Sequence, residues 1–133
     1  MVPENVRQSV EHAMQSFRIA ENELNRPNED AVTLCACHTT RNSVNKFLHS
    51  YLLSQSADTI EKHLDDLLSQ CSKLDSRFDA IDLSCFKCGT SDKDECEHTY
   101  CLSVEKVSEC FNQATAVKQL VMEKLQLSER DFQ

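Results

Sequence analysis

Glycine and proline are nearly absent from this sequence, which has one glycine, two prolines and no tryptophan among 133 residues. A β-sandwich or β-barrel needs many tight turns, and glycine and proline are the residues that usually form them. Their scarcity excludes these folds and favours helices. A chain of this length buries roughly two-thirds of its unfolded surface in a single core, so we expect one domain over residues 1–133.

Positive charge and long apolar runs are also lacking. The 14 Lys and Arg residues face 22 Asp and Glu residues, for a net charge of −8. General DNA or RNA binding usually needs a basic face, so we expect none. No run approaches the ~20 apolar residues of a membrane helix, and residues 1–10 carry charges where a signal peptide is apolar. We therefore expect a cytoplasmic protein without membrane contact, in which most of the eight cysteines are buried thiols.

Apolar residues recur at spacings of three and four along most of the chain, as in amphipathic helices. The pattern predicts helices over residues 3–24, 29–55, 59–75, 77–87 and 102–127. Pro27 ends the first helix, because a proline disfavours helical geometry in the residue before it. Short joints favour antiparallel packing, which predicts an all-α, up-and-down bundle of four to five helices. Residues 88–99 are expected to form the main loop, and residues 128–133 a polar tail.

Four segments carry a further pattern: RNSVNKFLHSYLL (41–53), HLDDLLSQC (63–71), FDAID (78–82) and SVEKVSECFNQA (103–114). Together they resemble the HEPN family, named for higher eukaryotes and prokaryotes nucleotide-binding domains. The resemblance implies a HEPN-like helical bundle, commonly a homodimer. It also implies a nucleotidyltransferase partner in a toxin–antitoxin or nucleotide-handling pair.

Catalytic HEPN proteins are metal-independent ribonucleases whose signature is an arginine followed, a few residues later, by a histidine near the start of the last helix. This sequence has no arginine between Arg77 and Arg130, and the histidine in that region is His98. Lys93 could replace the arginine, but lysine lacks the planar fork that holds a phosphate. The resemblance therefore favours a non-catalytic module that binds a nucleotide or a protein. The enzymatic alternative is a divergent, toxin-like ribonuclease using Lys93 and His98.

A second alternative comes from cysteines in and beside the loop. The run CFKCG has the shape of a zinc knuckle, and CEH and a further cysteine follow across an acidic segment. The candidate ligands are Cys85, Cys88, Cys96, His98 and Cys101. A structural zinc here would make the chain an interaction protein with a stapled loop. The competing interpretation, that these cysteines are core and surface thiols, needs no cofactor.

The predicted second helix carries a polar group that consists of Arg41, Asn42, Asn45, Lys46 and His49. Members three or four positions apart point to the same side of a helix. The group is thus a candidate face for a nucleotide or a partner, with a solvated flank around the core as the alternative. On the same helix, Cys35 and His38 are expected to pack in the core.

Overall fold

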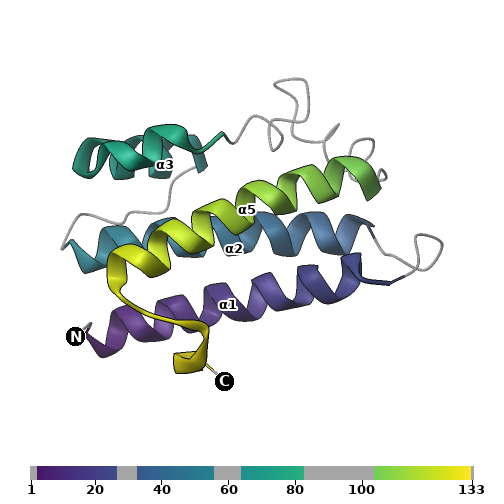
Figure 1. Ribbon diagram of the computed structural model, residues 1–133, viewed down its shortest axis with the longest axis horizontal. Helices are drawn as coiled ribbons and strands as arrows, with labels where there is room; N and C mark the ends of the chain where they lie inside the picture. The colour runs from purple at the N-terminus through teal and green to yellow at the C-terminus, as the bar shows by residue number, and fades with distance from the viewer. Residues whose placement is uncertain (1–2, 27–32, 56–63, 83–103, 133) are drawn as a thin grey trace.

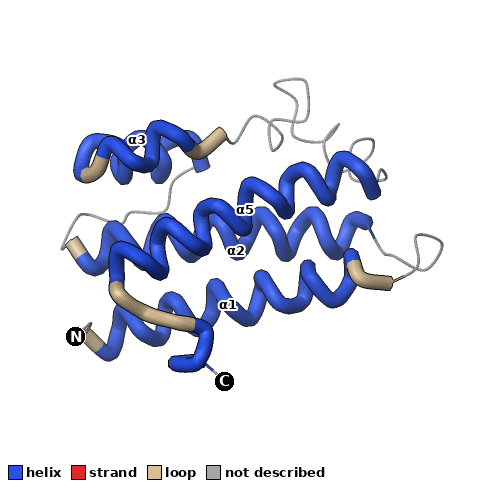
Figure 2. Tube along the Cα trace, in the orientation of Figure 1, coloured by secondary structure: helices blue, strands red, loops and turns tan. Residues whose placement is uncertain are grey.

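The computed structural model describes residues 3–26, 33–55, 64–82 and 104–132. Its elements are the α-helices α1 (Glu4–Leu24), α2 (Thr33–Ser54), α3 (Leu64–Leu74) and α5 (Val104–Leu125), and the 3-10 helices η1 (Ser76–Ala80) and η4 (Glu129–Phe132). No strand occurs in the described ranges (Figure 2). The prediction of an all-α bundle is confirmed. None of the described helices is both long and apolar enough to cross a membrane.

Helix α2 lies at the centre of the bundle. It packs along α1 and α5 and, at one end, against α3, whereas α1 and α5 touch each other much less (Figure 1). Its largest core side chains are fully buried, among them Phe47, Leu48 and Leu52. Because three other helices use α2 as their support, its sides facing them are filled with side chains, and its remaining side is left for other contacts.

The apolar stripe of α1 explains where that helix begins and how it packs. Pro3 is extended, and Glu4 opens the helix directly after it. The buried stripe repeats every three or four residues and consists of Val6, Val10, Ala13, Met14, Phe17 and Ala20. The ring of Phe17 stacks on that of Phe111 of α5, with 4.7 Å between centroids. The stripe joins α1 to both α2 and α5.

The predicted helix over residues 77–87 is wrong over its described part. Residues Ser76–Ala80 form the 3-10 helix η1, and Ile81 is extended with φ −81° and ψ 127°. Asp75 caps η1, because its side chain accepts a hydrogen bond from the backbone N–H of Arg77. Phe78 is buried within η1, and Ile81, directly after it, packs against the core as a partly buried side chain, so neither needs a longer helix.

His38 is exposed, which contradicts its predicted place in the core. The side of α2 that faces inward there carries Ala36, Cys37 and Thr40 instead. These small side chains allow neighbouring residues to pack closely against α2, and the imidazole of His38 remains hydrated on the outer side of the helix. The side chain of Cys35 lies outside the described residues.

The described residues of the predicted polar tail, 128–132, fold back onto α1. Leu127 and Phe132 pack against the core as partly buried side chains. The guanidinium of Arg7 donates a hydrogen bond of 2.7 Å to the carbonyl of Asp131, and that of Arg18 one of 3.1 Å to the carbonyl of Phe132. Two apolar side chains in a mostly polar stretch thus attach the segment to the bundle.

Candidate functional site

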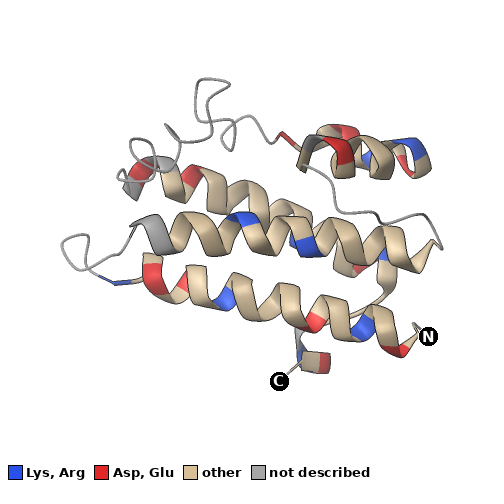
Figure 3. Ribbon diagram, turned by 180° about the vertical axis from the view of Figure 1, so that it is seen from behind, with Lys and Arg blue, Asp and Glu red and all other residues tan. Residues whose placement is uncertain are grey.

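The candidate site is the α2 flank, defined as Arg41, Asn42, Asn45, Lys46 and His49. Asn42 is exposed and the other four side chains are half-buried. Lys and Arg positions of the described helices are coloured blue in Figure 3, and α2 carries two of them, Arg41 and Lys46. The five residues lie within the helix α2, whose period places them on one side, and each keeps part of its side chain exposed.

A hydrogen bond between two serine hydroxyls joins α2 to α1 next to the α2 flank. The buried hydroxyl of Ser50 donates 2.7 Å to the carbonyl of Lys46 and lies 2.6 Å from the hydroxyl of Ser9 on α1. The hydroxyl of Ser43, also buried, donates 2.7 Å to the carbonyl of Thr40. The contact between Ser50 and Ser9 thus holds the side of α2 beside the α2 flank against α1.

Electrostatics within the α2 flank keep its histidine neutral. Partial burial, and then the nearby Lys46 ammonium, lower the pKa of His49 below its usual value of 6.5. Near pH 7 the imidazole is therefore uncharged and has one donor and one acceptor nitrogen. Lys46 and His49 are three positions apart on α2, a spacing that places them on the same side of the helix.

The chemistry available on the α2 flank is suited to recognition. Asn42, Asn45 and neutral His49 offer both donors and acceptors, the combination that reads the edge of a base or a peptide. Lys46 and Arg41 add positive charge in a chain whose net charge is −8. These side chains can orient a ligand with a polar ring and an anionic group, and none of the carboxylates that acid–base chemistry often uses is among them.

The lowered pKa of His49 predicts that acidification destabilises the fold. Below about pH 6.5 the histidine of the unfolded chain takes up a proton that the folded chain resists, so the free energy of unfolding falls as the pH falls. Urea unfolding at pH 7.5 and 5.5 measures this slope. We expect His49→Gln to flatten it, with His12→Gln on the exposed side of α1 as the matched control. An unchanged slope in His49→Gln would contradict the prediction.

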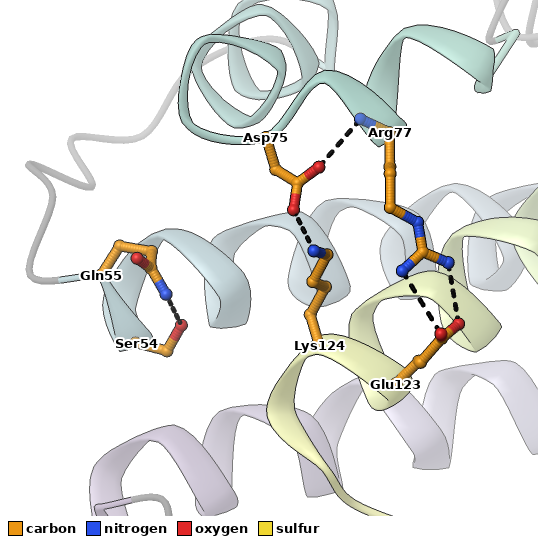
Figure 4. Close-up of polar contacts among 6 residues, drawn as sticks. All are labelled: Ser54, Gln55, Asp75, Arg77, Glu123 and Lys124. Atoms are coloured by element: carbon orange, nitrogen blue, oxygen red, sulfur yellow. Dashed lines mark hydrogen bonds and ion pairs between the residues drawn. The ribbon is translucent and has the colours of Figure 1, made fainter.

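A second polar cluster joins η1 to the end of α5 (Figure 4). Both guanidinium NH groups of Arg77 bind Glu123, at 3.3 and 2.9 Å, and the ammonium of Lys124 contacts the carboxylate of Asp75. The hydrogen bond with Lys124, and then that from the backbone of Arg77, lower the pKa of Asp75, and Arg77 lowers that of Glu123. Each charge already has a partner, so this cluster fastens two elements and offers no acid–base pair.

Sequence reasoning missed this cluster. Arg77 and Glu123 are 46 positions apart, and no spacing rule relates residues at that distance. The one local signal in the sequence was Asp75, a residue type that often caps the start of a helix. Its carboxylate accepts a hydrogen bond from the backbone N–H of Arg77, two residues later. That signal predicts the start of η1 but not its partner on α5.

Several predicted site residues lie outside the described part of the chain. They are Cys85, Cys88, Lys93, Cys96, His98 and Cys101. Within the described part, no group of three metal-binding side chains comes together. Cys37, Cys71 and Cys110 are buried thiols. The zinc-stapled loop and the Lys93–His98 ribonuclease therefore stay predictions.

Comparison with known proteins found no matching family model, no similar curated protein and no similar solved structure. The α2 flank itself is therefore the basis for a functional proposal.

Proposed function

We propose that this chain is a non-catalytic, HEPN-like module that binds a nucleotide through the α2 flank. The observation that carries the proposal is the arrangement on one accessible side of α2. Neutral His49 and two amides lie there beside the cations Arg41 and Lys46. Amides and a neutral imidazole can pair with a base edge, and the cations can pair with a phosphate.

The net charge of the whole chain bears on which anionic ligand the cations of the α2 flank would bind. A net charge of −8 repels polyanions in general, so a local pair of cations favours a small anion over a long nucleic acid. Bases also offer fixed donors and acceptors, which fits the neutral part of the α2 flank. The proposal includes a nucleotidyltransferase as the partner, a homodimer as the assembled form and a cytoplasmic location. The buried thiols of Cys37, Cys71 and Cys110 support a reducing compartment.

The proposal predicts that nucleotide binding depends on Lys46. In calorimetric titrations of the intact protein with adenosine and guanosine mono- and triphosphates, we expect saturable binding at low salt. Lys46→Ala should weaken it about five- to a hundredfold, because a charge-assisted hydrogen bond contributes roughly 1–3 kcal/mol. Asn45→Ala should weaken nucleotide binding and leave binding of inorganic phosphate unchanged.

Lys73→Ala is the matched control, because Lys73 is exposed on α3, outside the α2 flank. It removes the same charge from the chain and should leave the affinity unchanged. An equal loss of nucleotide affinity in Lys73→Ala and Lys46→Ala would show that the effect comes from the overall charge of the chain and not from the α2 flank. No binding of any of these nucleotides by the wild-type protein would refute the proposal.

A further inference from the structure

The segment after α5 is attached to the bundle by hydrogen bonds to α1 and by two apolar side chains packed against the core. We name residues 126–132 the C-terminal clasp. It leaves the end of α5 and crosses to α1, where η4 lies (Figure 1). The backbone N–H and hydroxyl of Ser128 donate to the carboxylate of Asp131, at 2.8 and 3.4 Å, which closes the turn of η4. The clasp is therefore a folded unit with its own local bonds.

The surface that receives the clasp is built by two arginines of α1. Arg7 and Arg18 are eleven positions apart, which is about three helical turns, so they lie on the same side of α1. They donate to consecutive carbonyls, those of Asp131 and Phe132, and the Arg7 guanidinium also lies 5.4 Å from the Phe132 ring centroid. Carbonyls at a helical C-terminus carry partial negative charge, which the two cations complement. We name these two arginines and the apolar surface under Phe132 the clasp seat.

The hinge between α5 and the clasp holds an unfavourable backbone conformation. Gln126 has φ +56°, the left-handed region that glycine normally occupies at a helix end. Its N–H bonds to the carbonyl of Glu123, and that of Leu127 bonds to the carbonyl of Met122. The chain therefore reverses direction at a residue that prefers to continue the helix. Docking of the clasp on its own seat compensates for this backbone cost.

We propose that the clasp seat is an interaction surface for the clasp of a second copy of this chain. If Gln126 takes the right-handed conformation, α5 continues past Leu125 and carries the clasp away from its own α1. The seat then presents two guanidiniums and an uncovered apolar surface, and the segment that matches them is the clasp of another copy. Exchange keeps every seat contact and relieves the hinge, which is the usual condition for swapping a terminal element.

The test changes the hinge and leaves the seat intact. Gln126→Gly removes the backbone cost and should favour the closed monomer by roughly five- to tenfold. Gln126→Val places a β-branched residue where the left-handed region is least tolerated and should shift the equilibrium by at least a similar factor toward exchange. Light scattering over a range of protein concentrations should show association in Gln126→Val that grows with concentration and exceeds the assembled form of Gln126→Gly, whichever state that reference variant has. Gln119→Val, an exposed position within α5, is the matched control.

A second pair of variants tests whether the seat is what the exchanged clasp binds. Adding Arg7→Ala and Arg18→Ala to Gln126→Val should return the protein to the oligomeric state of Gln126→Gly. Arg26→Ala, at an exposed arginine just after α1, is the control for loss of charge. The inference is overturned if Gln126→Val and Gln126→Gly have the same oligomeric state at every concentration. It is equally overturned if the association beyond that of Gln126→Gly persists without the two seat arginines.

Discussion

Phe78→Ala should destabilise the protein by about 3–5 kcal/mol, the usual range for emptying a buried phenylalanine site. Phe78 is fully buried although it belongs to a five-residue 3-10 helix. Its ring lies 4.8 Å from that of Tyr51 on α2. Few backbone bonds hold so short an element, so Phe78 is its main attachment to the bundle. Since small domains have roughly 5–15 kcal/mol of stability, the loss removes a large part of the total.

Urea unfolding followed by far-UV circular dichroism measures this effect, with Phe78→Leu as the control. Leucine refills part of the site, so we expect that variant to lose much less, about 1–2 kcal/mol. Asp79→Ala, next to it on the exposed side of η1, should stay close to the wild type. A loss below about 1 kcal/mol in Phe78→Ala would show that η1 is not anchored through this ring.

The thiol of Cys71 should be nearly inert in the folded protein. It is fully buried in α3, and its sulfur lies 3.7 Å from the carbonyl of Leu48, to which it donates. Burial raises its pKa from 9.0 to about 12, a difference of three units. At a given pH below 9 the reactive thiolate is then about a thousandfold scarcer than in the unfolded chain. We expect iodoacetamide to alkylate Cys71 at least that much more slowly in native than in urea-unfolded protein.

Peptide mapping by mass spectrometry after timed alkylation resolves Cys71 from the other cysteines. The same peptide in urea is the internal control, since only the fold differs. The raised pKa of Cys71 also makes the stability of the protein depend on pH, because the folded state resists ionisation of this thiol. The contribution of the neutral thiol to the free energy of unfolding is complete below about pH 9 and decreases as the pH rises toward about 12. Native alkylation at a rate close to that in urea would show that Cys71 is accessible.

Periodicity alone predicted the helices with long apolar stripes. The stripe from Val6 to Ala20 repeats often enough to define both the element and its buried side. The spacing of the α2 flank likewise placed its five residues on one side of a helix, because α-helical geometry relates residues three and four apart wherever the helix lies. What spacing could not supply is the shift in the pKa of His49, which arises from burial and from Lys46 together.

The misplaced elements share one physical cause, which is that neighbours distant in sequence decided them. His38 fits a core position by local pattern, but the packing of α2 turned Cys37 and Thr40 inward instead. Phe78 suggests a longer helix by its spacing, but it belongs to a five-residue 3-10 helix whose distant contacts are to Tyr51 of α2 and, through Arg77, to Glu123 of α5.

The sequence by itself determined that this protein is helical, because glycine and proline are scarce and apolar residues follow the helical period over most of its length. Those are local properties, and a helix satisfies its backbone hydrogen bonds locally. Only the tertiary structure decided that Arg77 meets Glu123 and that the clasp returns to Arg7 and Arg18. These contacts span 46 to 124 positions, and they form because packing of the core brings the ends of α1, α5 and η1 together.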